Sequence, residues 1–325
     1  MIARIRQLFD PYIALMVATV AIAALLPAHG RGAAIAGAAA DAGIVFLFFL
    51  YGARLSPQAA LAGLVQWRLH LAILASTFIL FPLLGLGFEH LAGSLLPPAL
   101  VTGLLFLCVL PSTVQSSIAF TSIARGNVPA ALCAASLSNI LGVFISPLLA
   151  SWLLSAQGAA LSFDVLQDII LQLLVPFIAG QLLRRWIGEW VTRNKKVLGY
   201  ADRGSILLII YVAFSKGMQD HIWSQIGLAD LGILIVLLCV LLALALTITA
   251  VLGRRLLRFS VEDEIALQFC GSKKSMASGL PMATVIFAGP LLGMIVLPLM
   301  LFHQIQLIVC AFLARHYANR PGDTA

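Results

Sequence analysis

The stretch that decides the fold reads FCGSKKSMASGLP and occupies residues 269–281. It places two glycines, three serines and the adjacent Lys273 and Lys274 inside a segment whose two flanks are apolar. A charged side chain at the centre of a bilayer costs roughly 2.5 kcal/mol or more, so such a residue marks a candidate functional site. The rest of the chain therefore has to supply whatever makes two lysines tolerable at that depth.

The composition is that of an integral membrane protein surrounded by a lipid bilayer. Hydrophobic residues make up 61% of the chain, charged residues 10%, and the mean hydropathy is +1.04. About a quarter of the residues of a soluble domain are charged. The net charge of +7 is therefore typical of cytoplasmic loops rather than of a nucleic-acid surface. The five cysteines fit no metal-binding spacing, and we expect no cofactor other than, at most, a sodium ion.

Hydropathy predicts ten membrane-spanning helices. A helical span needs about 20 apolar residues, and lipid forces every backbone polar group to be satisfied within the protein, which favours helices where no barrel-type alternation exists. The predicted spans are 12–28, 33–55, 69–88, 98–124, 128–154, 165–183, 205–217, 227–252, 261–288 and 293–314, with a small-residue linker at 155–162 and a basic loop at 184–203.

The distribution of positive charge predicts cytoplasmic N- and C-termini. With that orientation, sixteen of the 20 Lys and Arg residues fall in cytoplasmic segments, and only Arg31 and Lys216 fall outside. The remaining two are Lys273 and Lys274. Because cytoplasmic loops carry the excess of Lys and Arg, this asymmetry supports both the orientation and the count of ten spans.

Ten spans divide into two five-helix repeats, residues 1–154 and 164–317. An odd number of spans in each repeat forces the second repeat to be inverted relative to the first. The fourth helix of each repeat carries a break, at Pro111 in one and at residues 271–275 in the other. Paired broken helices in matching positions indicate a transporter's binding site near the middle of the membrane.

Polar residues around the two breaks are the candidate ligands of an ion or a substrate. Pro111 lacks an N–H and should end a helix, which frees backbone groups beside a run of hydroxyl and amide side chains. Oxygen ligands suit a hard cation such as sodium, and half-helix ends suit charged ligands. For isolated serines and for Asn139, a role in helix packing is the alternative. The candidates are Thr113, Gln115, Ser116, Ser117, Ser136, Asn139, Ser272, His303 and Gln304.

Lys273 cannot reach a membrane surface from an uninterrupted helix. It lies 11 residues after Glu262, about 16 Å along a helix, which exceeds the length of a lysine side chain. The two ammonium groups therefore need internal partners. These could be backbone carbonyls, Gln and Ser side chains, an anionic substrate, or the carboxylates of Asp41, Asp164 or Asp168.

The pattern resembles the bile acid:sodium symporter superfamily over the whole chain. The residues that carry the resemblance are the breaks in spans four and nine, the sequence ARGN at 124–127, and the pair His303 and Gln304. The resemblance implies a panel domain of spans 1, 2, 6 and 7 and a core domain of spans 3–5 and 8–10. It also implies that the broken helices cross in the core and hold two sodium ions, with a small organic anion bound between the domains.

The sequence departs from the sodium-coupled members at the ninth span. Ser116 and Ser117 resemble the family's sodium-binding pair and are the candidate metal ligands if sodium is bound. The sodium-bridging glutamate of the family is replaced by Phe269, its sodium-binding glutamine by Lys273, and its substrate-facing asparagine by Lys274. These departures resemble the branch of the orphan seventh vertebrate member and its bacterial relatives.

We therefore predict a secondary active transporter of a small organic anion, and not an enzyme, that works by alternating access. In this hypothesis Lys273 replaces a sodium ion and, with Ser272, Gln115, Ser116, Ser117, Ser136 and Asn139, forms the coupling site. Lys274, Thr113, His303 and Gln304 would bind the substrate. Coupling to sodium or to a proton released by a lysine stays open. The alternatives are a non-transporting membrane regulator or scaffold, and an intramembrane enzyme with a Ser–Lys nucleophile at Ser116, Ser117 and Lys273.

Overall fold

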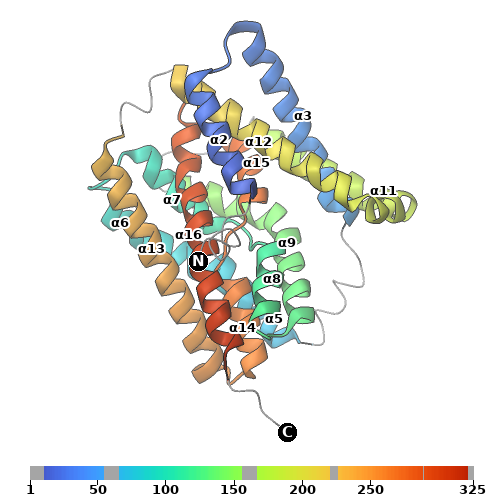
Figure 1. The fold of residues 1–325 in the computed structure, drawn as a ribbon, viewed down its shortest axis with the longest axis vertical. Coiled ribbons are helices and arrows are strands. Elements are labelled where there is room, and N and C mark those ends of the chain that lie inside the picture. Colours follow the sequence, from blue (N-terminus) through green and yellow to red (C-terminus); the bar gives the residue numbers. More distant parts are fainter. Residues whose placement is uncertain (1–10, 55–65, 156–166, 220–225, 288, 321–325) are drawn as a thin grey trace.

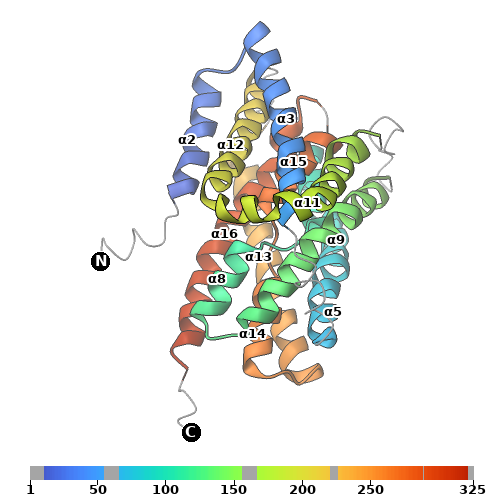
Figure 2. The same ribbon diagram turned by 90° about the vertical axis from the view of Figure 1, so that its right-hand side faces the viewer.

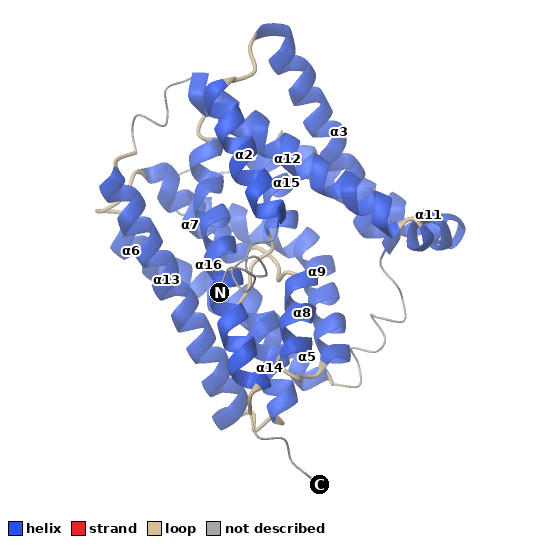
Figure 3. Cartoon of the chain, viewed as in Figure 1, coloured by secondary structure: helices blue, strands red, loops and turns tan. Residues whose placement is uncertain are grey.

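The computed structural model describes residues 11–54, 66–155, 167–219, 226–287 and 289–320, and every regular element in these ranges is a helix (Figure 3). Arg4, Arg6, Asp164 and nearly all of the predicted linker lie outside the described residues. The helices, with three π-helical turns labelled η, are α2 (Pro11–Leu25), α3 (Gly30–Arg54), α5 (Trp67–Ala75), η1 (Ser76–Leu80), α6 (Phe81–Ala92), α7 (Pro98–Val109), α8 (Gln115–Ile123), α9 (Val128–Ser155), η2 (Ile170–Leu174), α11 (Val175–Arg193), α12 (Lys195–Gln219), α13 (Leu228–Val251), η4 (Leu252–Leu256), α14 (Val261–Gly271), α15 (Met276–Ile286) and α16 (Leu292–Ala318).

Within the described residues, seven helical segments are long and apolar enough to cross a membrane. They are Gly30–Arg54, Trp67–Ala92, Val128–Leu153, Gln167–Arg193, Lys195–Gln219, Leu228–Leu256 and Leu292–Ala318, and the shorter apolar helices Ala14–Leu25 and Pro98–Val109 accompany them. Because lipid favours closed backbone hydrogen bonding, these helices confirm an all-helical membrane protein. The count of ten spans and the inverted repeat stay predictions.

The predicted basic loop at 184–203 is wrong. Helix α11 continues to Arg193, α12 begins at Lys195, and only Asn194 separates them. The seventh predicted span, 205–217, is accordingly the second half of a 25-residue helix. Arginine and lysine are good helix formers, and their charged ends can stay in water while their stems lie along a helix. Hydropathy therefore located the end of the apolar segment and not the end of the helix.

Two groups of helices can be distinguished in Figures 1 and 2, and they meet where α12 contacts α15 and α16. Helices α2, α3 and α12 lie together at one end, and α11 packs along α3. In the other group, α7 is buried along nearly its whole length between α6, α9 and α16. Because the break that follows α7 starts from this buried helix, the first interruption lies inside the protein.

Two glycines allow the close approach of α3 and α11. A Cβ atom on Gly52 would collide with the backbone carbonyl of Phe177, and one on Gly180 would collide with that of Phe49. Each glycine thus faces the backbone of the other helix, an arrangement typical of helix pairs in membranes.

We expect Gly180→Ala to destabilise the protein by about 2 kcal/mol, because a backbone carbonyl cannot move aside as a flexible side chain can. Thermal unfolding in detergent micelles measures the effect. Gly37→Ala on α3 is the matched control, since nothing lies within 4 Å of its added methyl group, and it should be neutral or stabilising. Equal melting temperatures for the two variants would contradict the close approach.

Candidate functional site

The first break lies between α7 and α8 and follows from Pro111. The residue before a proline is pushed out of the helical region into an extended conformation. Leu110 shows this conformation, with φ −73° and ψ 153°, and the chain resumes a helix at Gln115. The break in the fourth predicted span is confirmed.

The second break lies between α14 and α15 and contains both lysines. Helix α14 ends at Gly271, and α15 begins at Met276. The side chain of Ser275 accepts a hydrogen bond from the amide of Ser278 and so caps the start of α15, as serine does at many helix N-termini. The break in the ninth predicted span is confirmed as well.

The two breaks are bonded to each other. The amide of Ser275 donates to the carbonyl of Pro111 at 2.8 Å. Two hydroxyls near the first break also donate to backbone carbonyls at the end of α14. Ser112 donates to the carbonyl of Cys270 at 2.5 Å, and Ser117 donates to that of Phe269 at 3.0 Å. Backbone groups that the interruptions freed are thereby paired inside the protein, as lipid requires.

The ammonium group of Lys274 lies in a cage of three backbone carbonyls. Its Nζ donates to the carbonyls of Thr77 at 2.8 Å, Cys108 at 2.9 Å and Leu110 at 2.7 Å. Three acceptors match the three N–H bonds of an ammonium group. The side chain has no solvent exposure, and Nζ also lies 4.2 Å from the centre of the Phe81 ring. The side-chain nitrogen of Lys274 is thus buried among three hydrogen-bond acceptors, the number that an ammonium group requires.

Two prolines explain why the carbonyls of Thr77 and Cys108 are free. In the π-helical turn η1 the amide of Phe81 donates to the carbonyl of Ser76, five residues earlier. The same spacing makes Pro82 the expected donor to the carbonyl of Thr77, but proline has no N–H. At the end of α7, the helix stops before Pro111, and the amide of Ser112 donates to the hydroxyl of Ser138 instead of to Cys108. The C-terminus of a helix carries a partial negative charge. Lys274 therefore neutralises the end of α7.

Lys273 lies on the other side of the break in an aromatic pocket. It has no solvent exposure, and its Nζ lies 4.5 Å from the ring centre of Phe120 and 5.7 Å from that of Phe269. Its Nζ also donates to the hydroxyl of Ser116 at 3.3 Å. Ring faces attract cations, so Phe269 supplies at this site an attraction for an ammonium group.

The lysines therefore use carbonyls, a hydroxyl and rings rather than the carboxylates of Asp41 or Asp168 that the sequence suggested as partners. Backbone carbonyls were among the predicted partners, but Phe120, Thr77 and the end of α7 were not named as parts of the site. Phe120 lies four residues after Ser116 on α8, a helical spacing that could have revealed its ring beside the hydroxyl run.

Helix α16 reaches the second break through Gln306, which was not among the predicted binding residues. Its side-chain amide accepts from the backbone N–H of Lys274 and donates to the backbone carbonyl of the same residue, both at 2.9 Å. His303 contacts Gln306 at 2.9 Å, whereas the side-chain oxygen of Gln304 is buried without a hydrogen-bond partner in the described part of the chain. Gln306 holds the peptide that carries Lys274.

The remaining predicted residues occupy different positions around the breaks. The hydroxyl of Thr113 bonds those of Ser116 and Ser117 at 2.8 and 2.9 Å. Asn139 on α9 joins both breaks, since it donates to the carbonyl of Ser112 at 2.6 Å and accepts from the hydroxyl of Ser278 at 2.7 Å. Gln115 is exposed at the first residue of α8, Ser136 is half-buried on α9, and Ser272 donates to the carbonyl of Gln268 within α14.

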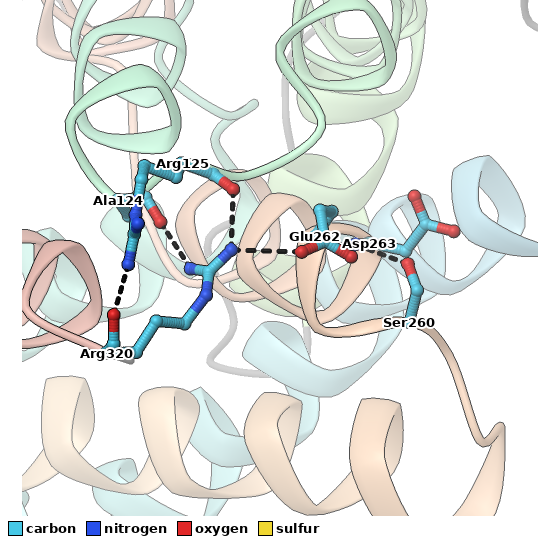
Figure 4. A network of polar contacts seen from close by, with 6 residues as sticks. All are labelled: Ala124, Arg125, Ser260, Glu262, Asp263 and Arg320. Atoms are coloured by element: carbon cyan, nitrogen blue, oxygen red, sulfur yellow. Dashed lines mark hydrogen bonds and ion pairs between the residues drawn. The ribbon is translucent and has the colours of Figure 1, made fainter. Parts of the chain in front are cut away.

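We call the place where the two breaks are bonded to each other the crossing. Away from it, Arg125 and Arg320 form an arginine clamp that joins α8, α14 and α16 (Figure 4). Arg320 donates to the carbonyls of Ala124 at 2.6 Å and Arg125 at 2.8 Å, and it pairs with Glu262 at 3.0 Å. Arg125 donates back to the carbonyl of Arg320 at 2.5 Å. The clamp therefore joins the ends of α8 and α14 that lie away from the breaks, and it gives the first two residues of the ARGN sequence a structural role.

We expect Arg320→Gln to lower the free energy of unfolding by about 2 kcal/mol, because two carbonyls at the end of α8 lose charged donors. The half-exposed pair with Glu262 adds little to this figure. Arg315→Gln, an exposed residue on α16, is the control. Chemical denaturation in micelles compares the two, and an equal response would show that the clamp is not a stabilising element.

Comparison with known proteins gives a consistent set of similarities. The model of the SBF-like CPA transporter family matches residues 10–319. An uncharacterized protein of Pseudomonas aeruginosa is 56% identical over 99% of this chain and 97% of its own length. The Escherichia coli protein named "Putative symporter YfeH" is 47% identical over 97% of this chain and 94% of its own. Sodium/bile acid cotransporter 7 of Rattus norvegicus is 27% identical over 82% and 79%.

Proposed function

Because the chain belongs to the SBF-like CPA transporter family, we propose that it is a secondary active transporter of a small organic anion. It is an integral membrane protein of a transporter family rather than an enzyme. The observation that carries the proposal is the bonded crossing of two broken helices with two buried lysines. Broken helices that meet inside a membrane protein place helix ends and free backbone groups where ions and charged substrates can bind.

The proposed architecture has ten spans in two inverted repeats, with both termini in the cytoplasm. Helices α2, α3, α11 and α12 form the panel, and α5–α9 with α13–α16 form the core. Alternating access follows from motion of the core against the panel. The packing of α11 along α3, and of α12 on α2 and α3, supports this division, and α12 meets the core at α15 and α16.

In the proposed mechanism both lysines act as built-in cations, so that no sodium ion is needed at the crossing. For Lys273, the support is its contact with Ser116, one of the pair that resembles the family's sodium ligands. For Lys274, the carbonyl cage favours a second cation position over the substrate contact that the sequence suggested, because all three of its N–H donors are used. Phe269 brings no carboxylate to the site, so these residues suit ammonium groups better than a sodium ion.

The proposed place for the anion is the side of the crossing where α8 and α15 begin. Helix N-termini carry partial positive charge and attract anions. Gln115 and Ala277, in the first turns of α8 and α15, are exposed. Thr113, which bonds the serines of α8, would position this turn.

Uptake into proteoliposomes tests the proposal. Radiolabelled taurocholate, succinate and benzoate serve as probe anions, under a sodium gradient, a proton gradient, or neither. We expect at least one probe to accumulate above protein-free vesicles without sodium. Failure of all three under every gradient would favour the second candidate, a non-transporting regulator or scaffold. Accumulation that requires sodium would overturn the built-in cations but not the transporter.

A further inference from the structure

A tyrosine of the panel bonds a backbone carbonyl of the core next to the lysine break. The hydroxyl of Tyr51 on α3 donates to the carbonyl of Ala277 on α15 at 3.2 Å, across 226 residues of sequence. Figure 2 shows α3 passing beside α15. Ala277 lies two residues after the capping Ser275, so the bond is made to the first turn of the half-helix that leaves the break.

The acceptor is available because of a proline. In a regular helix the carbonyl of residue 277 accepts the amide of residue 281. Residue 281 is Pro281, inside α15, and proline has no N–H to donate. The carbonyl of Ala277 is therefore open to a donor from outside the helix, and Tyr51 provides one.

Tyr51 is held in position by its own group of helices. The neighbouring Gly52 sits against the backbone of α11, and the ring of Phe48 packs edge-on against Tyr51 at 5.6 Å. One turn further along α3, Arg54 pairs with Asp202 of α12 at 2.5 Å. The tyrosine thus lies on a helix of the proposed panel, whereas its acceptor lies on α15 of the proposed core.

We propose that Tyr51 is a positioning residue that latches the panel to the core in the conformation described. The inference rests on the proposed transport function, since only a motion of core against panel gives the latch a task. When the two groups separate, the bond breaks and the carbonyl of Ala277 becomes free to accept a hydrogen bond from water or from a substrate. A neutral hydrogen bond of this kind shifts a two-state equilibrium by roughly two- to twelvefold.

Distances between spin labels on the panel and on the core test the latch. The labels are placed at the exposed Ile35 of α3 and Leu91 of α6, with the exposed Cys239 changed to alanine. In the full-length protein, we expect Tyr51→Phe to raise the ratio of a second interlabel distance to the first by roughly two- to twelvefold. In a Pro281→Ala background, the backbone N–H that the substitution restores can bond the carbonyl from within the helix, and Tyr51→Phe should then have a much smaller effect.

Tyr211→Phe is the matched control. Its hydroxyl donates to the carbonyl of Leu26 at 2.8 Å, a contact within the panel, so the distance distribution should not change. A Tyr51→Phe distribution identical to that of the unsubstituted protein, or an equal shift in Tyr211→Phe, overturns the latch. If the latch is overturned but two distances are populated and taurocholate, succinate or benzoate is taken up, the proposed function stands. If a single distance is populated and no probe is taken up, both the latch and the proposed function are overturned.

Discussion

Lys274→Met is expected to be the most destabilising single substitution at the crossing, with a loss of about 3 kcal/mol or more in the free energy of unfolding. Methionine has nearly the length of lysine but donates no hydrogen bond, so the carbonyls of Thr77, Cys108 and Leu110 lose their shared donor. Each buried carbonyl left unpaired costs roughly 1–3 kcal/mol. Part of this cost is offset because no charge is then buried. Thermal and denaturant unfolding in micelles would measure the loss.

Two further lysine substitutions make this prediction specific. Lys273→Met removes one hydrogen bond of 3.3 Å and the contacts with two rings, so it should cost clearly less than Lys274→Met. Lys196→Met, at an exposed position of α12, should be close to neutral. Equal losses for Lys273→Met and Lys274→Met would contradict the assignment of Lys274 as the cation that neutralises the end of α7.

The second large effect is expected from the double substitution Phe269→Glu and Lys273→Gln, which should create a response to sodium. It restores the residue types that the resemblance assigns to sodium-coupled members and places a carboxylate beside Ser116 and Ser117. A ligand that binds only the folded state stabilises it by about 1.4 kcal/mol at ten times its Kd. We expect the melting temperature of the double variant to rise when sodium chloride replaces choline chloride.

The unsubstituted protein and the single variant Lys273→Gln provide the comparison for this experiment. The first keeps its ammonium group at the site, and the second lacks the carboxylate, so neither should show the sodium-specific rise. A rise of the same size in the unsubstituted protein would mean that sodium binds beside the lysines. No rise in a folded double variant would mean that residues beyond these two determine sodium binding.

Much of the architecture follows from the sequence because the responsible residues act locally. Pro111 ends α7 through its own ring and through the extended Leu110 that precedes it, so the first break could be located without knowledge of the fold. Apolar segments likewise predicted most helices. The boundary between α11 and α12 could not be predicted in this way, since the chain becomes polar at Arg184 while α11 continues to Arg193.

The partners of the lysines depended on contacts distant in sequence. The carbonyl of Thr77 lies 197 residues from Lys274, and it is free only because η1 and Pro82 change the hydrogen bonding of that helix. Sequence reasoning could assign Lys274 a buried position, but not which of its candidate partners it meets. Gln306 was not predicted as a binding residue, because its contact with Lys274 depends on the fold. The resemblance pointed to the pair His303 and Gln304 instead.

The most direct test of the built-in cations is equilibrium binding of radioactive sodium to the purified protein. The account predicts no saturable sodium binding to the unsubstituted chain, because ammonium groups already lie at Ser116 and within the carbonyl cage of α7. It also predicts saturable binding to the Phe269→Glu and Lys273→Gln variant. Saturable, stoichiometric sodium binding to the unsubstituted protein would contradict the account.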